Sequence, residues 1–244
     1  MHRDAEAVDQ LWKEAMAALD REDPDAAEAI GLQLRDLGHS SCFEVVALAR
    51  LRRGDAAGAA VVLEKGVAVA PGVWLLWNLL GNARSDLGDY VGARAAYTSG
   101  LACAGADHGT FEFNLAVVDW REGRLDEALT RLTAFESRAS DDSGVRRAAL
   151  NTRLAILRER RNCTSRAARA WRLTVQVGED PLDFLQIFEV VADDATAALR
   201  FVIEDFGRDY AGATLESATA GEPAPEALLG VYEALGRVYY DPDP

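Results

Sequence analysis

Residues 74–97 read WLLWNLLGNARSDLGDYVGARAAY, and this stretch decides the fold that we expect. Its larger and apolar side chains recur at intervals of three and four, which places one stripe on each of two short helices. The first stripe begins at Trp74 and the second at Tyr90, with Gly88 between them. Proline, which breaks helices, is absent from 72–180. The stretch therefore predicts a pair of helices joined by a tight turn.

The same pattern returns along the chain at a nearly fixed interval. The turn glycines of three units, Gly54, Gly88 and Gly123, are separated by 34 and then 35 residues. Small residues let paired helices approach closely, and a period in this range is typical of repeat proteins whose units stack into one continuous core. Aligning the units on these glycines superposes Ala47, Gly81 and Ala116, then Ala59, Ala93 and Ala128, then the larger Leu63, Tyr97 and Leu132.

The unit around Gly88 resembles the tetratricopeptide repeat. The W-x2-L-G and A-x3-F/Y positions of that family are matched by Trp77, Leu80, Gly81, Ala93 and Tyr97, whereas Arg84 replaces the usual tyrosine and Gly105 the usual closing proline. The resemblance covers about residues 40–178. It implies an all-α fold, a right-handed α-α superhelical solenoid of stacked helix-turn-helix repeats.

Outside these repeats the pattern is less regular. We expect a degenerate helix pair over 1–39, repeats over 40–178 with a weaker copy from Val145 to Trp171, a second degenerate pair over 179–207, a flexible segment over 208–225, and a C-terminal helix with an acidic tail over 226–244. The last helix is predicted from the apolar stripe of Leu228, Val231, Tyr232, Leu235, Val238 and Tyr239. We expect it to cap the final repeat, and the alternative is that it lies in the groove of the solenoid.

The composition argues against several classes of protein. A formal net charge of −14 disfavours broad attraction to nucleic acid or to anionic lipid. The N-terminus has no cationic stretch before an apolar run, and no segment approaches 18 uninterrupted apolar residues. The three cysteines, Cys42, Cys103 and Cys163, are an odd and dispersed set, unlike a disulfide framework or a zinc-ligand pattern. We therefore expect a cytoplasmic protein with reduced thiols.

Signals for catalysis are weak. No nucleotide-binding loop, nucleophile elbow or HExxH spacing occurs. His39 precedes Ser40 and Ser41, but these serines are interpreted as a helix N-cap, with Glu44 completing a capping box. The sequence thus predicts a non-enzymatic protein of bacterial type without cofactor or metal.

In tetratricopeptide repeats the first helix of each pair lines a concave groove, so the resemblance implies a binding face. Its candidate residues are Asn78, Leu79, Asn82 and Asp86, then Phe113, Asn114, Val117, Trp120 and Arg121, then Arg153 and Ile156. Apolar anchors supply affinity and amides can hydrogen-bond a peptide backbone, so we expect a peptide or helix of a protein partner to bind there. Asn114 and Arg153 match half of the family's clamp for a terminal carboxylate, but Leu79 and Ala149 do not, which favours an internal segment.

Two other functions stay open at this point. In the first, the protein self-associates as a structural repeat, and its own chain or a second copy occupies the groove. In the second, an Arg-dependent surface binds nucleic acid, because residues 141–175 hold nine arginines against three acids. Residues 176–244 hold three arginines against 15 acids. We therefore expect many of the clustered arginines to pair with the acidic C-terminal third of the same molecule.

Overall fold

A computed structural model describes residues 2–103, 105, 108–136, 144–177 and 184–239. The chain separates into two compact units, Met1–Arg131 and Leu132–Pro244, and each unit is described by itself. The first unit is helical. The second contains a four-stranded sheet, which corrects the expectation of an all-α chain.

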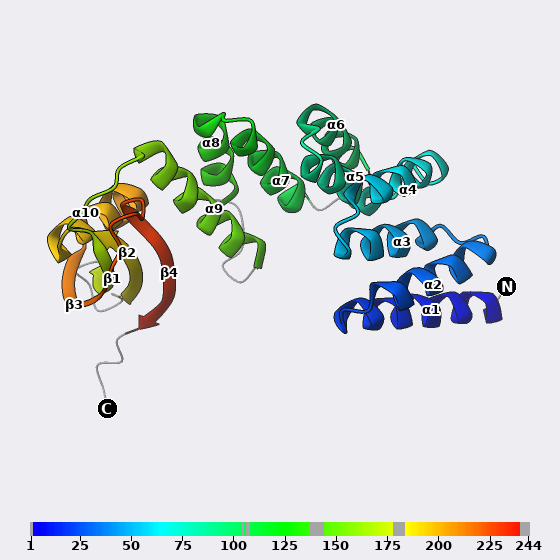
Figure 1. The fold of residues 1–244 in the computed structure, drawn as a ribbon, viewed down its shortest axis with the longest axis horizontal. Coiled ribbons are helices and arrows are strands. Elements are labelled where there is room, and N and C mark those ends of the chain that lie inside the picture. The colour runs from blue at the N-terminus through cyan, green and yellow to red at the C-terminus, as the bar shows by residue number, and fades with distance from the viewer. Residues whose placement is uncertain (1, 104, 106–107, 137–143, 178–183, 240–244) are drawn as a thin grey trace. The chain divides into compact units, whose positions relative to one another are not determined.

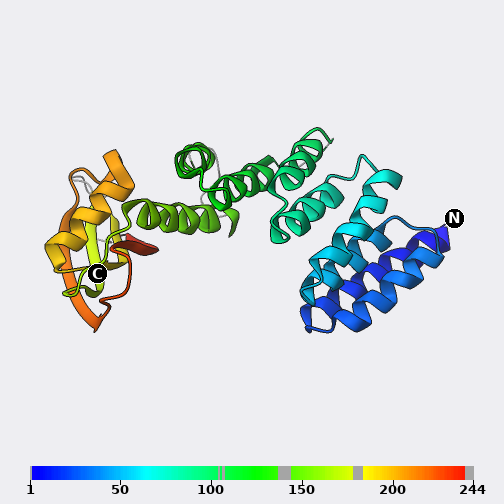
Figure 2. The same ribbon diagram turned by 45° about the horizontal axis from the view of Figure 1, so that its top comes forward.

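The helical unit contains the predicted helix pairs, and each helix packs against the next (Figures 1 and 2). The first helices α1, α3, α5 and α7 also contact one another in order, so they form one layer of the stack. The helices are α1 (His2–Asp20), α2 (Pro24–Asp36), α3 (Ser41–Arg52), α4 (Ala56–Val69), α5 (Trp74–Asp86), α6 (Tyr90–Leu101) and α7 (His108–Arg121), and α8 (Leu125–Glu136) begins in this unit and ends in the next.

The turns inside the pairs follow one rule. Gly54, Gly88 and Gly123 adopt φ values of 78°, 77° and 76°, a left-handed conformation that glycine reaches without a steric penalty. Asp55 and Asp89 follow the first two glycines and cap the second helix of each pair. Their carboxylates accept the N–H of the residue three positions on, at 2.8 and 2.9 Å.

The N-terminal pair uses the same turn with a different residue. Glu22 takes the glycine position at φ 60°, and Asp23 accepts the N–H of Ala26 at 3.0 Å. The predicted capping box at α3 is absent, because Ser40 makes no side-chain hydrogen bond to the helix. Instead Nδ1 of His39 accepts the N–H of Ser41 at 3.3 Å. His39 is thus part of the helix start.

Ion pairs join neighbouring helix pairs to one another. Arg50 of α3 donates to Glu28 of α2 at 3.1 Å. At the corresponding places α7 carries Asp119 and α6 carries Arg94, and the two side chains pair at 2.8 Å with the charges exchanged. Asp119 is buried and also accepts hydrogen bonds from arginines of the α7–α8 region, Arg124 and Arg131. The α2–α3 and α6–α7 contacts therefore share an ion pair at this position with opposite polarity, whereas Arg84 of α5 pairs with Glu64 of α4 at a different position.

The C-terminal unit is a helix-covered antiparallel sheet. The strand order is β3-β1-β2-β4, and all three pairings are antiparallel. Its elements are α9 (Gly144–Arg161), β1 (Arg169–Val177), β2 (Phe184–Ala192), α10 (Ala195–Phe206), the 3-10 helix η1 (Gly207–Tyr210), β3 (Thr214–Pro223) and β4 (Gly230–Tyr239). The helix α10 contacts all four strands, and α9 packs against β4.

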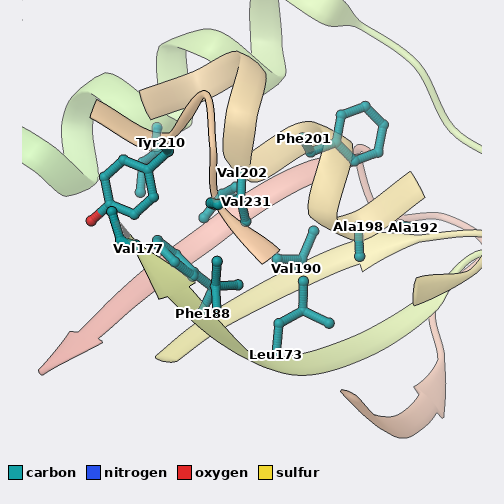
Figure 3. Packing of buried hydrophobic residues seen from close by; sticks show 13 residues of the cluster. Leu173, Val177, Phe188, Val190, Ala192, Ala198, Phe201, Val202, Tyr210 and Val231 are labelled. Carbon is teal, nitrogen blue, oxygen red and sulfur yellow. The ribbon is translucent and has the colours of Figure 1, made fainter. Parts of the chain in front are cut away.

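One face of this sheet forms the core of the unit. Leu173 of β1, with Phe188 and Val190 of β2, packs with Ala198 and Val202 of α10 (Figure 3). These strand residues alternate with more exposed neighbours, as expected for a sheet covered on one face.

Four sequence predictions fail in this unit. The weaker repeat copy from Val145 supplies only its first helix, α9, because the chain leaves the helix at Asn162 with φ 45° and then enters β1, where Trp171 lies. The range 179–207 holds β2 and one helix instead of a helix pair, and 208–225 holds β3 instead of a flexible segment. The expected C-terminal helix is β4, and the acidic tail from 240 lies outside the described residues.

The expected pairing of the arginine cluster with acidic residues of 176–244 is found at two arginines. Arg161 pairs with Asp205 at 2.7 Å, and Arg172 pairs with Glu189 at 2.7 Å. Arg158 donates to the carbonyl oxygen of Val231 and lies 3.9 Å from the centroid of the Tyr232 ring. Burial lowers the pKa of the Arg158 guanidinium, although the neighbouring Tyr232 and Asp205 oppose this shift.

Candidate functional site

The predicted binding residues Asn78, Asn82 and Asp86 of α5 meet Asn114 and Arg121 of α7, and together with Ser85 of α5 they form what we call the amide face. Asn78 and Ser85 are buried at its base, and the other four side chains reach solvent. The Nδ2 group of Asn114 donates to Oδ1 of Asn78 at 2.8 Å and to Oδ1 of Asn82 at 3.4 Å. Three asparagines from two repeats are therefore joined into one hydrogen-bonded group.

The buried side chain of Tyr97, on α6, holds one of the three asparagines in place. Its hydroxyl donates to Oδ1 of Asn82 at 2.7 Å. Burial raises the pKa of the Tyr97 hydroxyl, which keeps the phenol protonated and able to donate at neutral pH. The ring can come this close because residue 81 is glycine: a Cβ atom there would lie 2.2 Å from Cε1 of Tyr97. The close approach of α5 and α6 at Gly81 thus also positions the side-chain amide of Asn82.

A second link lies one turn further along α5 and two turns further along α7. Nη1 of Arg121 donates to Oγ of Ser85 at 2.9 Å and to Oδ1 of Asp86 at 3.2 Å. Both charged side chains are well exposed, so the pair adds little to stability. Its main effect is to hold two polar side chains in place beside the asparagines.

These contacts leave part of the hydrogen-bonding capacity unused. Asn114 spends both Nδ2 hydrogens on its two neighbours, and within the described residues no partner is found for its Oδ1 or for the Nδ2 groups of Asn78 and Asn82. Each amide group can form up to four hydrogen bonds. Asn82 and Asn114 are half-buried, so the free Nδ2 group of the first and the free Oδ1 of the second offer a donor and an acceptor to a ligand, whereas Asn78 is buried and supports them from within the helical unit.

The apolar residues predicted for the site differ in how far they are exposed to solvent. Phe113, Val117 and Trp120 are half-buried on α7, where a ligand can reach part of each side chain. Leu79 is buried and packs with residues of α3, α4 and α5. Leu79 therefore belongs to the core of the unit rather than to its surface.

The two remaining predicted residues lie in the C-terminal unit. Nε of Arg153 donates to Glu136 at 2.9 Å, and its Nη1 donates to the carbonyl oxygen of Asp205 at 2.6 Å. Ile156 is fully buried. Both side chains are therefore engaged inside the C-terminal unit.

Sequence reasoning missed the role of Tyr97, which it assigned only to packing. The signal was the pairing of Gly81 with a tyrosine at the aromatic position, since a tyrosine carries a hydroxyl that must find a partner when buried. The described residues hold no cluster of three or more His, Cys, Asp or Glu suited to a metal. Nor does any helix in the described ranges have the length and apolar character needed to cross a membrane.

Comparisons with known proteins bear on the fold. No family model and no curated protein matches the chain. A thermophilic TPR protein from Thermus thermophilus is similar in structure, with 23% identity, a TM-score of 0.52, and coverage of 60% of this chain and 79% of its own. The helical unit has a tetratricopeptide-repeat fold.

A second solved structure agrees with this assignment. It is a single-residue variant of a protein with nearly identical TPR-like repeats, from a putative kinesin light chain of Podosopora anserina. It shares 14% identity and a TM-score of 0.50, with coverage of 66% of this chain and 87% of its own. At these identities the likeness concerns the tetratricopeptide-repeat fold alone.

Proposed function

We propose that the tetratricopeptide-repeat unit is a non-enzymatic interaction module that binds an extended, internal peptide segment of a partner protein along the amide face. The observation that carries this proposal is the hydrogen-bonded group of Asn78, Asn82 and Asn114, with its unused donors and acceptor.

The hydrogen-bonding groups of an extended peptide complement those of the amide face. Its backbone N–H and C=O groups need partners wherever they lose water, and the side-chain amides supply partners of both kinds. Half-buried Phe113 and Trp120 lie on the same helix as Asn114 and can pack against an apolar side chain of the ligand. Aromatic residues at such positions commonly carry most of the binding energy.

The fold removes one possible occupant of the groove from the alternative of self-association. The C-terminal helix that was expected to cap the repeats or fill their groove does not exist, because residues 230–239 form β4. A second copy as occupant of the amide face is therefore the form of this alternative that an experiment needs to address. Static light scattering over a range of protein concentrations separates a dimer from a monomer.

The proposal is tested by selecting peptides of about 12 residues from a random phage-displayed library on the full chain, then measuring dissociation constants for the best peptide. Trp120→Ala should weaken binding by about 2 kcal/mol, or roughly 30-fold, as loss of an aromatic anchor does. Asn114→Ala should weaken it by a smaller factor, about 3- to 10-fold.

The matched control is Asn151→Ala, which removes an exposed asparagine from α9 in the other unit. It should leave the dissociation constant unchanged. The proposal fails if no peptide is selected, or if Asn114→Ala and Trp120→Ala behave like Asn151→Ala. Circular dichroism of each variant checks that helical content is retained.

A further inference from the structure

A second surface of the helical unit lies away from the amide face, between the second helices of two neighbouring pairs. We call it the outer groove: a cavity of about 250 Å³ whose floor is α3 and whose walls are α2 and α4. Cys42, Phe43 and Val46 form the floor, with Leu32 on one wall and Val61 on the other. The groove therefore follows one helix and is bordered by two.

The lining of the outer groove is apolar and partly open to water. Leu32 is 39% exposed and Val61 is 53% exposed, although both are large apolar side chains on helices. Burial raises the pKa of the Cys42 thiol, so this side chain stays neutral at the floor. Apolar side chains gathered at an open cavity favour the docking of another apolar group.

Charged residues at the outer groove have one sign. Arg35, Arg50 and Lys65 line it, and no acidic residue does. Arg50 is already engaged by Glu28 and by the carbonyl oxygen of Gly58, at 3.1 and 3.2 Å, and Arg35 is engaged by Asp36 at 3.0 Å. Lys65 has no ion pair or hydrogen bond within the described residues. In a chain with a net charge of −14, this is a site at which a carboxylate is attracted.

Backbone chemistry decides which form of ligand suits this surface. The floor and walls are side chains of three helices, whose own N–H and C=O groups bond within the helices. An extended peptide would lose water over this floor without gaining partners for its backbone, which is costly. A helix satisfies its own backbone and needs only an apolar stripe, which is the helix-in-groove mode of recognition.

We propose that the outer groove is a second binding surface, which takes a short amphipathic helix of a partner protein with acidic residues flanking its apolar stripe. An apolar side chain of that helix fills the cavity beside Leu32 and Val61. Its flanking carboxylates lie near Lys65 on the α4 wall. The two faces of the repeats thus recognise two kinds of segment, extended on one and helical on the other.

The test uses a synthetic, fluorescein-labelled helical peptide of roughly 16 residues, long enough to be helical, with leucines at i, i+4 and i+7 and glutamates beside them. A peptide of the same composition in permuted order is the ligand control. Fluorescence anisotropy with the full chain should give saturable binding for the first peptide and at least about tenfold weaker binding for the second.

Variants locate the bound peptide. Lys65→Glu and Val61→Glu should each weaken binding about tenfold or more, because both put negative charge at the groove. Val91→Glu is the matched control, since Val91 is 78% exposed on α6 and does not line the groove. It should change the dissociation constant by less than about twofold. All three positions are exposed, and circular dichroism verifies their folding.

Several results would overturn the inference. Equal binding of the permuted peptide, or equal weakening by Val91→Glu, would show that the peptide does not recognise this groove. Weakening by Asn114→Ala would place the helical peptide on the amide face instead. Saturable binding of decanoate that depends on Lys65, without binding of the peptide, would assign the groove to a small amphiphilic anion. Binding of an extended peptide at the amide face is tested separately, with the phage-selected peptide and the variants Asn114→Ala and Trp120→Ala.

Discussion

At the scale of single residues, the closest approach between paired helices depends on the absence of one methyl group. A Cβ atom at position 81 would lie 2.2 Å from the Tyr97 ring. Gly81→Ala should therefore lower the free energy of unfolding by about 1–3 kcal/mol, as overpacking does. Gly72→Ala is the control, because a Cβ atom there meets nothing within 4 Å. Urea unfolding that gave the same loss for both variants would contradict the packing described.

The hydroxyl of Tyr97 predicts a pH dependence. Its pKa is raised in the folded protein, so above about pH 10 the folded chain keeps a proton that the unfolded chain releases. The resulting stability is complete below about pH 10 and is lost as the pH rises further. Tyr97→Phe should cost about 1 kcal/mol at pH 7, through the lost hydrogen bond to Asn82, and should flatten the decline between pH 9 and 11. Identical declines in urea unfolding would refute this.

The sequence patterns predicted how the helices pack more accurately than they predicted which side chains lie on the binding face. The alignment of Gly81 with Ala47 and Ala116 identified a position of close approach, because size alone determines what fits between two helices. The resemblance to the tetratricopeptide repeat implied that Leu79 lies on the binding face, yet Leu79 is buried. A family pattern records which positions face the core on average. It does not record whether the side chains of an adjacent helix bury a given position in one particular protein.

At the scale of elements, we expect removal of the buried charge of Asp119 to lower the free energy of unfolding strongly. Asp119 is buried and accepts hydrogen bonds from three arginines of three different elements and turns. Asp119→Asn removes the charge that these arginines share and should cost about 3 kcal/mol in urea unfolding. Asp36→Asn, at an exposed carboxylate paired only with Arg35, should change stability by less than about 0.5 kcal/mol. Equal effects would mean that the network around Asp119 contributes little.

The elements of the C-terminal unit show where sequence periodicity stops being decisive. Val231, Leu235 and Val238 recur at three and four, which fits a helix, but β-branched residues also suit a strand. The strand forms because β4 pairs with β2, about 45 residues earlier in the chain, and no local pattern encodes that pairing. The helix pairs were predictable because their contacts are mostly between neighbours along the chain.

At the scale of the whole molecule, two units of different architecture share one chain, and the repeats carry two surfaces of different chemistry. The amide face is polar and suits an extended backbone, whereas the outer groove is apolar with a cationic border. Because the two lie on different helices, their ligands should bind together. A saturating amount of the helical peptide should leave the dissociation constant of the phage-selected peptide unchanged in anisotropy measurements. Mutual displacement would show that both bind at one place.

The most direct test of the account follows the side-chain amides themselves by NMR. The chain has five asparagines: Asn78, Asn82 and Asn114 belong to the amide face, whereas Asn151 and Asn162 belong to α9 and the turn after it. Their NH2 signals can be assigned by single Asn→Asp variants in a 15N-labelled protein. Titration with the phage-selected peptide should shift the first three signals and leave the other two in place. Shifts confined to Asn151 and Asn162, or saturable binding without a shift of the first three, would contradict the claim that the repeats bind peptide through the amide face.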